Sequence, residues 1–119
     1  MKKILFNILF FLAFYFLGCK KNITYKVIYS VNIVPINESL PVNTNIIYSN
    51  KNSNWNIENS NDLNWTYSLI RESDDLAFIR CEGKLNIKEI NIKVKYNSTE
   101  ESNNCTENNC SVEIRKNLR

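Results

Sequence analysis

The chain has 119 residues, with 15 Lys and Arg against 12 Asp and Glu for a net charge of +3, and it contains four Cys, two Gly, two Pro and no His. The lack of His excludes catalysis by a Ser–His or Cys–His pair and metal binding through imidazole. With glycine only at Gly18 and Gly83, a glycine-rich phosphate loop is excluded, and so small a net charge does not predict nucleic-acid binding.

The N-terminal segment predicts a signal peptide. Met1-Lys2-Lys3 is followed by an apolar stretch from Ile4 to Leu17. A positive start, a short apolar stretch and a small residue before the cleavage point are typical of secretory signals, whereas a membrane-spanning helix needs roughly 20 apolar residues. The ending Phe16-Leu17-Gly18-Cys19 resembles a bacterial lipobox, with Phe where Leu is usual. The alternatives are an uncleaved single-span anchor or a plain secretory signal.

On the lipobox interpretation, residues 1–18 form a lipoprotein-type signal peptide, and diacylglyceryl is attached to Cys19. Each buried acyl CH₂ contributes about 0.8 kcal/mol, so several chains on one cysteine anchor a protein durably. Residues 19–23 then form a tether, and loss of Lys2 and Lys3 lowers the net charge from +3 to +1. We expect a lipid-anchored protein of the cell envelope, with the outer membrane favoured and the domain outside the cytoplasm.

From residue 24 onward, apolar residues recur with the period of two that is typical of β-strands rather than helices. Leu76–Cys81 is apolar at successive positions and predicts a central strand that is buried on both faces. The alternating runs are Tyr25–Ile33, Trp55–Ile57, Leu63–Leu69, Ile90–Tyr96 and Cys110–Ile114.

Stretches rich in Asn, Ser and Asp separate these runs. Asn tolerates positive φ better than most residues, so it can replace the missing Gly in tight turns. About seven short strands joined by turns predict an all-β fold, an antiparallel β-sandwich over residues 24–119. The turn stretches are Asn37–Ser39, Ser49–Asn54, Asn59–Asp62, Ser73–Asp75 and Ser98–Asn109.

Three thiols remain if Cys19 is lipidated. An oxidising envelope compartment favours at least one disulfide. We expect Cys105 to pair with Cys110 across a short loop, which contributes about 2 kcal/mol on the loop-entropy model; the alternative pairs Cys81 with one of them. Three thiolates without His match no common zinc-ligand spacing, so no metal is expected. An unpaired Cys81 is most simply a buried strand residue.

The order of the strands resembles that of MmpS-like small envelope proteins. The similarity runs from residue 23 to 118, with Asn64 where the family has Pro and residues 98–109 where it has a Gly-rich hairpin. It implies an immunoglobulin-like sandwich outside the cytoplasmic membrane, without catalysis or a cofactor, and for some members a transport-accessory role. The segments that carry the resemblance are Tyr25–Val27, Asn45–Asn50, Leu63–Leu69, Asp75–Ile79, Ile92–Asn97 and Cys110–Arg115.

The first functional hypothesis is a non-catalytic, lipid-anchored binding or assembly module that meets an envelope protein partner. Trp55, Trp65 and Tyr67 could form an aromatic contact surface, because aromatic residues are enriched at interfaces. Core packing is the favoured interpretation of all three, since Trp65 and Tyr67 alternate in phase with Leu63 and Leu69.

The second hypothesis is a small inhibitor or immunity-type lipoprotein that blocks a hydrolase or toxin. Glu100–Glu101 could meet a cationic enzyme, although a solvated, mobile loop is the simpler interpretation of these residues.

An enzyme is not expected. Paired carboxylates are the only acid–base route that the composition leaves open, and Asp74–Asp75 are adjacent in a turn, while Glu58, Glu82 and Glu89 have no evident partner.

Overall fold

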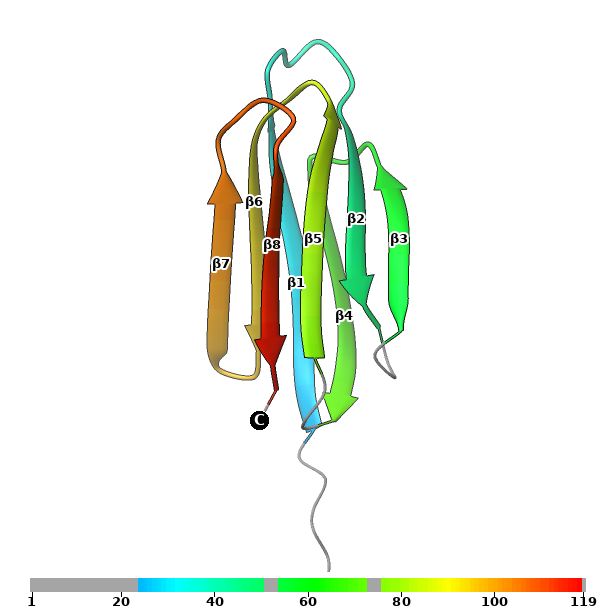
Figure 1. Cartoon of the computed structure of the whole chain (residues 1–119), viewed down its shortest axis with the longest axis vertical. Helices are drawn as coiled ribbons and strands as arrows, with labels where there is room; N and C mark the ends of the chain where they lie inside the picture. Colours follow the sequence, from blue (N-terminus) through cyan, green and yellow to red (C-terminus); the bar gives the residue numbers. More distant parts are fainter. Residues whose placement is uncertain (1–23, 51–53, 73–75, 119) are drawn as a thin grey trace, which may run out of the picture.

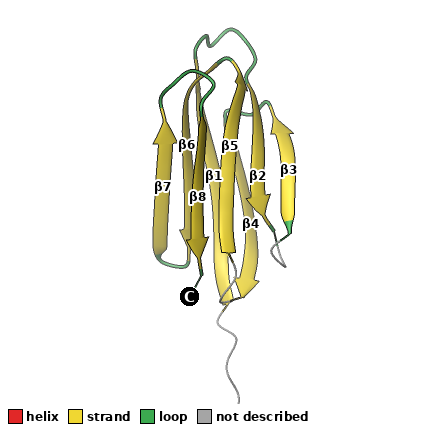
Figure 2. Ribbon diagram, viewed as in Figure 1, coloured by secondary structure: helices red, strands yellow, loops and turns green. Residues whose placement is uncertain are grey.

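The computed structural model describes residues 24–50, 54–72 and 76–118. These residues form eight β-strands and no helix, hence none long and apolar enough to cross a bilayer (Figure 1, Figure 2). The predicted signal peptide, Cys19 and the tether lie outside the described residues. The strands are β1 (Thr24–Pro35), β2 (Asn43–Ser49), β3 (Trp55–Ser60), β4 (Asn64–Glu72), β5 (Leu76–Leu85), β6 (Ile87–Tyr96), β7 (Thr99–Cys105) and β8 (Ser111–Asn117).

The strands form two antiparallel sheets of four strands each. Sheet A has the order β4-β1-β6-β7, and sheet B has the order β3-β2-β5-β8. The two sheets pack face to face, with β3 and β4 on one side of the molecule and β7 and β8 on the other (Figure 1). The predicted β-sandwich is therefore confirmed, with β5 as a central strand of sheet B.

The strand pairing follows the immunoglobulin pattern at its centre. In immunoglobulin domains the second and fifth strands are neighbours in one sheet, and the third and sixth are neighbours in the other. Here β1 pairs with β4, as the second and fifth immunoglobulin strands do, and β2 pairs with β5, as the third and sixth do. Strand β8 pairs with the other edge of β5. The β6–β7 hairpin lies between β5 and β8 in sequence but joins the opposite sheet, where β6 pairs with β1.

Among the described residues there are eight strands rather than about seven, because the predicted turn stretch Ser98–Asn109 contains β7. This strand pairs with β6 from Tyr96↔Thr99 to Ile90↔Cys105. Its residues are polar on both faces, so it lacks the alternation that identifies a strand in sequence. Pairing with a well-formed neighbour, rather than burial of apolar side chains, holds β7 in the sheet.

The core lies between the sheets and is built from the inward-facing alternate positions of the strands. Strand β1 shows the pattern most clearly: its odd-numbered residues from Val27 to Ile33 are at most 3% exposed. Because the side-chain period of a strand is two, this register commits every second residue of β1 to the core. The same alternation gives β6 its buried residues Ile90, Ile92, Val94 and Tyr96.

Asparagine makes the tight turns that the scarcity of glycine would otherwise prevent. Asn86, Asn97 and Asn109 have φ of 61°, 53° and 52°, which confirms the prediction for Asn in turns. Gly83 has a different role. A Cβ at this position would lie 2.9 Å from Asn109 Cα, and the Gly83 amide donates to the Cys110 carbonyl at 2.8 Å. Only glycine therefore permits this close approach of the two backbone segments.

Candidate functional site

Exposed apolar side chains gather on one side of the sandwich. We call strands β3 and β4, with the residue that precedes β4, the β3–β4 edge. Other large apolar side chains exposed in the described part of the chain lie in or beside the turns at one end. Several exposed apolar side chains on one side of a folded domain are typical of an interaction site. The edge carries Trp55 (50% exposed), Ile57 (71%), Leu63 (45%), Tyr67 (36%) and Ile70 (66%).

Strand β3 has an inverted pattern, with its apolar residues outside and its polar residues inside. Glu58 lies opposite the fully buried Ile46, and Ile57 lies opposite the half-buried Ile47. Residues that are directly opposite in neighbouring strands lie on the same face of the sheet. Glu58 therefore lies on the inner face of sheet B, where its side chain stays exposed at the rim, and Ile57 lies on the outer face. A one-residue slip would move Ile57 to the inner face, so the register keeps it on the outer face.

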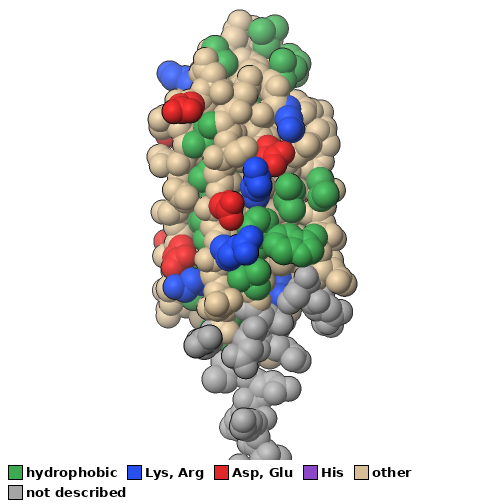
Figure 3. Space-filling view, in the orientation of Figure 1, with side chains coloured by type: hydrophobic (Ala, Val, Ile, Leu, Met, Phe, Trp, Pro, Cys, Tyr) green, Lys and Arg blue, Asp and Glu red, His purple; other side chains and the backbone are tan. Residues whose placement is uncertain are grey.

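The outward aromatic of β3 packs on its own sheet. The Trp55 ring meets the Phe78 ring edge-on, with centroids 4.5 Å apart, and the Arg115 guanidinium lies 5.1 Å from the Phe78 centroid. These contacts hold Trp55 in a defined position while half of its surface stays exposed. Figure 3 shows the outer face of sheet B, with apolar side chains on the β3 side and charged side chains toward β5 and β8.

Strand β4 contributes aromatic rings that face β3 across the sheets. Trp65 lies 5.1 Å from Tyr48 between ring centroids and 6.3 Å from Tyr67, with an interplanar angle of 13° to the latter. Its indole Nε1 donates to Glu58 Oε2 at 3.0 Å. Burial, followed by the nearby Glu58 carboxylate and Tyr67, raises the pKa of Tyr48, although the hydrogen bond from Asn56 lowers it.

Core packing is therefore the wrong interpretation for two of the three aromatic residues singled out in sequence. Trp65 is half-buried against the core, but Trp55 and Tyr67 are exposed. There are two physical reasons: Trp55 lies on the outer face of sheet B, and Tyr67 faces inward but from an edge strand, so its side chain lies at the rim of the core. The sequence alternation is correct, but it does not distinguish a rim position from a central one.

A buried polar cluster lies beneath this edge and ties the two sheets together. The Ser49 hydroxyl lies 2.8 Å from the Tyr29 hydroxyl of the opposite sheet, and it donates to the Leu76 carbonyl at 2.9 Å. It also accepts from the Phe78 amide at 3.0 Å and from Arg71 Nη1 at 3.2 Å. Burial raises the pKa of Tyr29, opposed by its hydrogen bond to Ser49. The hydrogen bonds of Ser49 thus link the two sheets beneath the β3–β4 edge.

The opposite side of the sandwich, formed by β7 and β8, is closed by specific links. Cys105 and Cys110 form a disulfide, the pairing that the sequence favoured. Lys116 Nζ lies 3.1 Å from Glu101 Oε1, and this hydrogen-bonded ion pair raises the pKa of Lys116. Asn103 Nδ2 donates to a β8 backbone carbonyl at 3.1 Å. Together these contacts join the two sheets along β7 and β8.

The acidic pair Glu100–Glu101 does not lie in a mobile loop, which corrects that interpretation. Both residues belong to β7. The neighbouring strand β6 supplies a lysine to Glu100, and strand β8 of the other sheet supplies a lysine to Glu101. Glu100 Oε1 lies 3.0 Å from Lys93 Nζ, and Glu101 is paired with Lys116. The negative charge of these residues is therefore largely matched within the fold.

The remaining sequence candidates are not assembled into a catalytic or metal site among the described residues. Cys81 is a fully buried thiol, and burial raises its pKa to about 12. Glu82 pairs with Arg80 at 3.1 Å and Lys84 at 3.3 Å. In the described ranges no group of three or more His, Cys, Asp or Glu side chains could hold a metal. Asp74–Asp75 lie outside these ranges.

No protein-family model matches the chain, and no curated protein is significantly similar to it. The resemblance to MmpS-like proteins therefore stays a prediction.

Proposed function

We propose that this protein is a non-catalytic binding or assembly module, anchored in the cell envelope through a lipid on Cys19, that docks a protein partner with its β3–β4 edge. The observation that carries the proposal is the inverted pattern of β3. This strand exposes Trp55 and Ile57 while it turns Glu58 inward. Such an arrangement costs apolar burial in the isolated domain, and a partner surface would recover it.

The outer edge of β4 supports docking on the same side of the sandwich. Strand β4 is nine residues long and lies at the end of sheet A, so no other described strand pairs with its outer backbone groups. Natural edge strands are commonly protected by outward charges, Pro or bulges. From Asn64 to Ile70, β4 has no charged residue and no Pro. An incoming strand could pair there, and its side chains would lie beside Tyr67 and Ile70 of β4.

The proposed anchor would hold this face near a bilayer. A tether of residues 19–23 reaches at most about 17 Å when fully extended. The first strand begins at the same end of the sandwich as β3 (Figure 1). The disulfide is compatible with a domain outside the cytoplasm. We favour a membrane-bound or membrane-adjacent protein partner for this reason.

The inhibitor hypothesis is not carried forward, because its motivating feature was the free negative charge of Glu100–Glu101. Each of these carboxylates has a lysine partner, so neither is available as an unpaired group for a cationic enzyme. No observation in the described residues favours that function over docking through the β3–β4 edge.

Two measurements test the proposal separately. The intact mass of protein extracted from membranes should show residues 1–18 removed and acyl chains on Cys19; an unmodified or uncleaved N-terminus would contradict the anchor. Chemical crosslinking in intact cells, followed by affinity purification, should recover a partner with the native chain and lose it with Ile57→Lys.

Ser111→Lys is the matched control, since it also adds a lysine to an exposed position on an edge strand of sheet B. The control should recover the partner as well as the native chain does. Equal recovery with both variants would contradict the assignment of the β3–β4 edge.

A further inference from the structure

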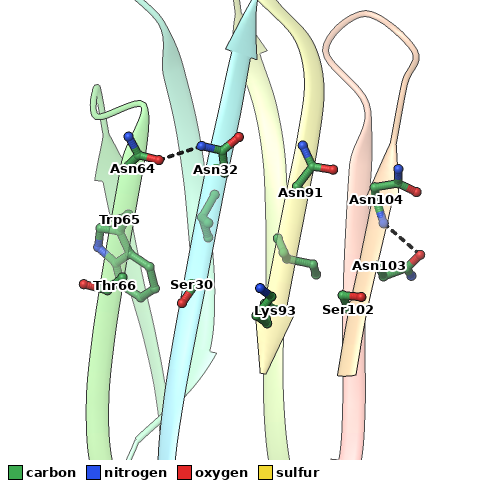
Figure 4. A pocket seen from close by; sticks show the side chains of 12 residues that line it. Ser30, Asn32, Asn64, Trp65, Thr66, Asn91, Lys93, Ser102, Asn103 and Asn104 are labelled. Carbon is green, nitrogen blue, oxygen red and sulfur yellow. Dashed lines mark hydrogen bonds between the residues drawn. The ribbon is translucent and has the colours of Figure 1, made fainter. Parts of the chain in front are cut away.

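A groove crosses the outer face of sheet A, on the side of that sheet away from the core. Its volume is about 550 Å³, and residues from β4, β1, β6 and β7 line it (Figure 4). The groove is therefore as wide as the whole sheet. It is distinct from the exposed apolar residues of β3, which belong to the other sheet.

The floor of the groove consists of two parallel rows of polar side chains. Each of the four strands contributes one side chain to each row. Because cross-strand partners share a face, the register aligns each row across the sheet. Neighbouring strands lie about 4.8 Å apart, so each row offers a polar group at that repeat. The first row is Asn64, Asn32, Asn91 and Asn104, and the second is Thr66, Ser30, Lys93 and Ser102.

The groove is electrically neutral. Lys93 is the one charged residue that lines it, and its Nζ is paired with Glu100 at 3.0 Å. A phosphate or carboxylate ligand would require an unpaired cation, and a purely apolar ligand would leave the amides without hydrogen-bond partners. The groove therefore suits an uncharged ligand that is rich in hydrogen-bonding groups.

Most side chains of the two rows have no hydrogen-bond partner among the described residues. Asn32 Nδ2 donates to Asn64 Oδ1 at 2.6 Å. In contrast, the described residues supply no hydrogen-bond partner to the other side chains of the two rows apart from Lys93. Asn59 on the other sheet differs: its Nδ2 donates to both Asn43 and Asn45, at 3.0 and 2.9 Å. The unpartnered side chains are those of Asn91, Asn104, Ser30, Thr66 and Ser102.

We propose that this groove binds an uncharged oligosaccharide that lies across the strands. Sugar hydroxyl and acetamido groups both donate and accept hydrogen bonds, as do the amides and hydroxyls of the two rows. A chain of linked sugars presents these groups repeatedly along its length, and the rows present their partners strand by strand. The inference does not depend on docking at the β3–β4 edge: β4 contributes Asn64, Trp65 and Thr66 to the groove, but none of the exposed apolar residues of that edge lines it.

The test is an NMR titration of the ¹⁵N-labelled full-length chain in a detergent without a sugar headgroup. The probes are chitotetraose, which carries acetamido groups, and cellotetraose, which carries hydroxyls alone. We expect shifts in the side-chain amide signals of Asn91 and Asn104 with one or both probes. A preference for chitotetraose would identify an acetamido-bearing glycan, and equal binding would identify recognition through hydroxyls.

A neutral hydrogen bond changes affinity by about fivefold, so the double variant Asn91→Ala/Asn104→Ala should bind about 25-fold more weakly. Asn117→Ala, on the exposed face of β8, is the matched control and should bind like the native chain. Thr66→Val removes one hydroxyl and should weaken binding about fivefold.

Backbone spectra verify that each variant is folded. The proposal is overturned if neither tetrasaccharide shifts the groove signals at millimolar concentration, if the shifts lie outside the groove, or if only a tetrasaccharide of galacturonic acid binds.

Discussion

Strands β7 and β8 form one side of the sandwich and strands β3 and β4 form the other, and the two sides end the core in different ways. On the first, the Cys105–Cys110 disulfide and the Lys116–Glu101 ion pair link one sheet to the other. On the second, the Trp65–Glu58 hydrogen bond crosses between the sheets, and Ile57 stays exposed. Every open sheet ends in edge strands. In this chain covalent and ionic links join the edge strands on the β7–β8 side, the closed side, whereas the β3–β4 side, the open side, keeps exposed apolar side chains.

The largest expected effect comes from the base of the open side. Ser49→Val should lower the free energy of unfolding by about 3 kcal/mol, because it removes the buried hydrogen bonds of the Ser49 hydroxyl with the Phe78 amide, the Leu76 carbonyl and Arg71. Urea unfolding measures this loss. Ser111→Val, at an exposed position of β8, should change stability little. A small effect at Ser49 would show that the open side is loosely built rather than held in place.

The next effect concerns the closed side. Cys105→Ser/Cys110→Ser should destabilise the fold by about 2 kcal/mol, the value expected for a short disulfide loop. Urea unfolding with and without reductant measures it, and reductant should have no effect on the double variant. Partner binding at the β3–β4 edge should be retained by the folded variant. Loss of binding without unfolding would mean that the two sides are coupled.

Cys81 lies in β5, between the two sides, and reports whether either side opens by itself. Burial raises the pKa of its thiol from 9.0 to about 12, so the folded state retains the proton that the unfolded state loses. The corresponding stability is complete below pH 9 and is lost as the pH rises toward 12, with a slope of up to about 1.4 kcal/mol per pH unit.

Urea unfolding at pH 8 and pH 10 checks this slope, and Cys81→Ala should reduce it. At pH 8, thiol-labelling reagents should react with Cys81 at the rate of global unfolding. Faster labelling would contradict the view that both sides are firmly held.

The smallest change in stability is expected at the surface itself. Ile57→Thr should alter the free energy of unfolding by less than about 0.5 kcal/mol, because the side chain is 71% exposed. Urea unfolding checks the stability, and crosslinking in cells checks binding, which should decrease. A large loss of stability would mean that Ile57 serves the fold rather than a partner.

Much of the fold could be predicted from alternation alone. The runs in β1 and β6 bury one residue in two, and burial on both faces explains the continuous apolar stretch that begins β5, where Ala77, Phe78 and Ile79 are all buried. Asparagines at positive φ could also be expected, since the chain has only two glycines. These features depend on local chemistry, which the sequence states directly.

The binding surfaces depend on register, which the sequence does not state. Trp55-Asn56-Ile57-Glu58 alternates clearly, but only pairing with β2 determines that Ile57 faces solvent and Glu58 faces inward. Strand β7 could not be predicted because both of its faces are polar, and pairing with β6 alone defines it. The rows of the groove likewise arise from three separate pairings of distant segments.

The central claim, that the protein contacts its partner through the β3–β4 edge, is tested most directly by site-specific photo-crosslinking in the cells that produce it. A photoreactive residue replaces Ile57 in one version and Ser111 in the other, both on outward positions of edge strands in sheet B. The account predicts a discrete crosslinked adduct from position 57 and none from position 111. Adducts of equal yield from both positions, or from position 111 alone, would contradict it.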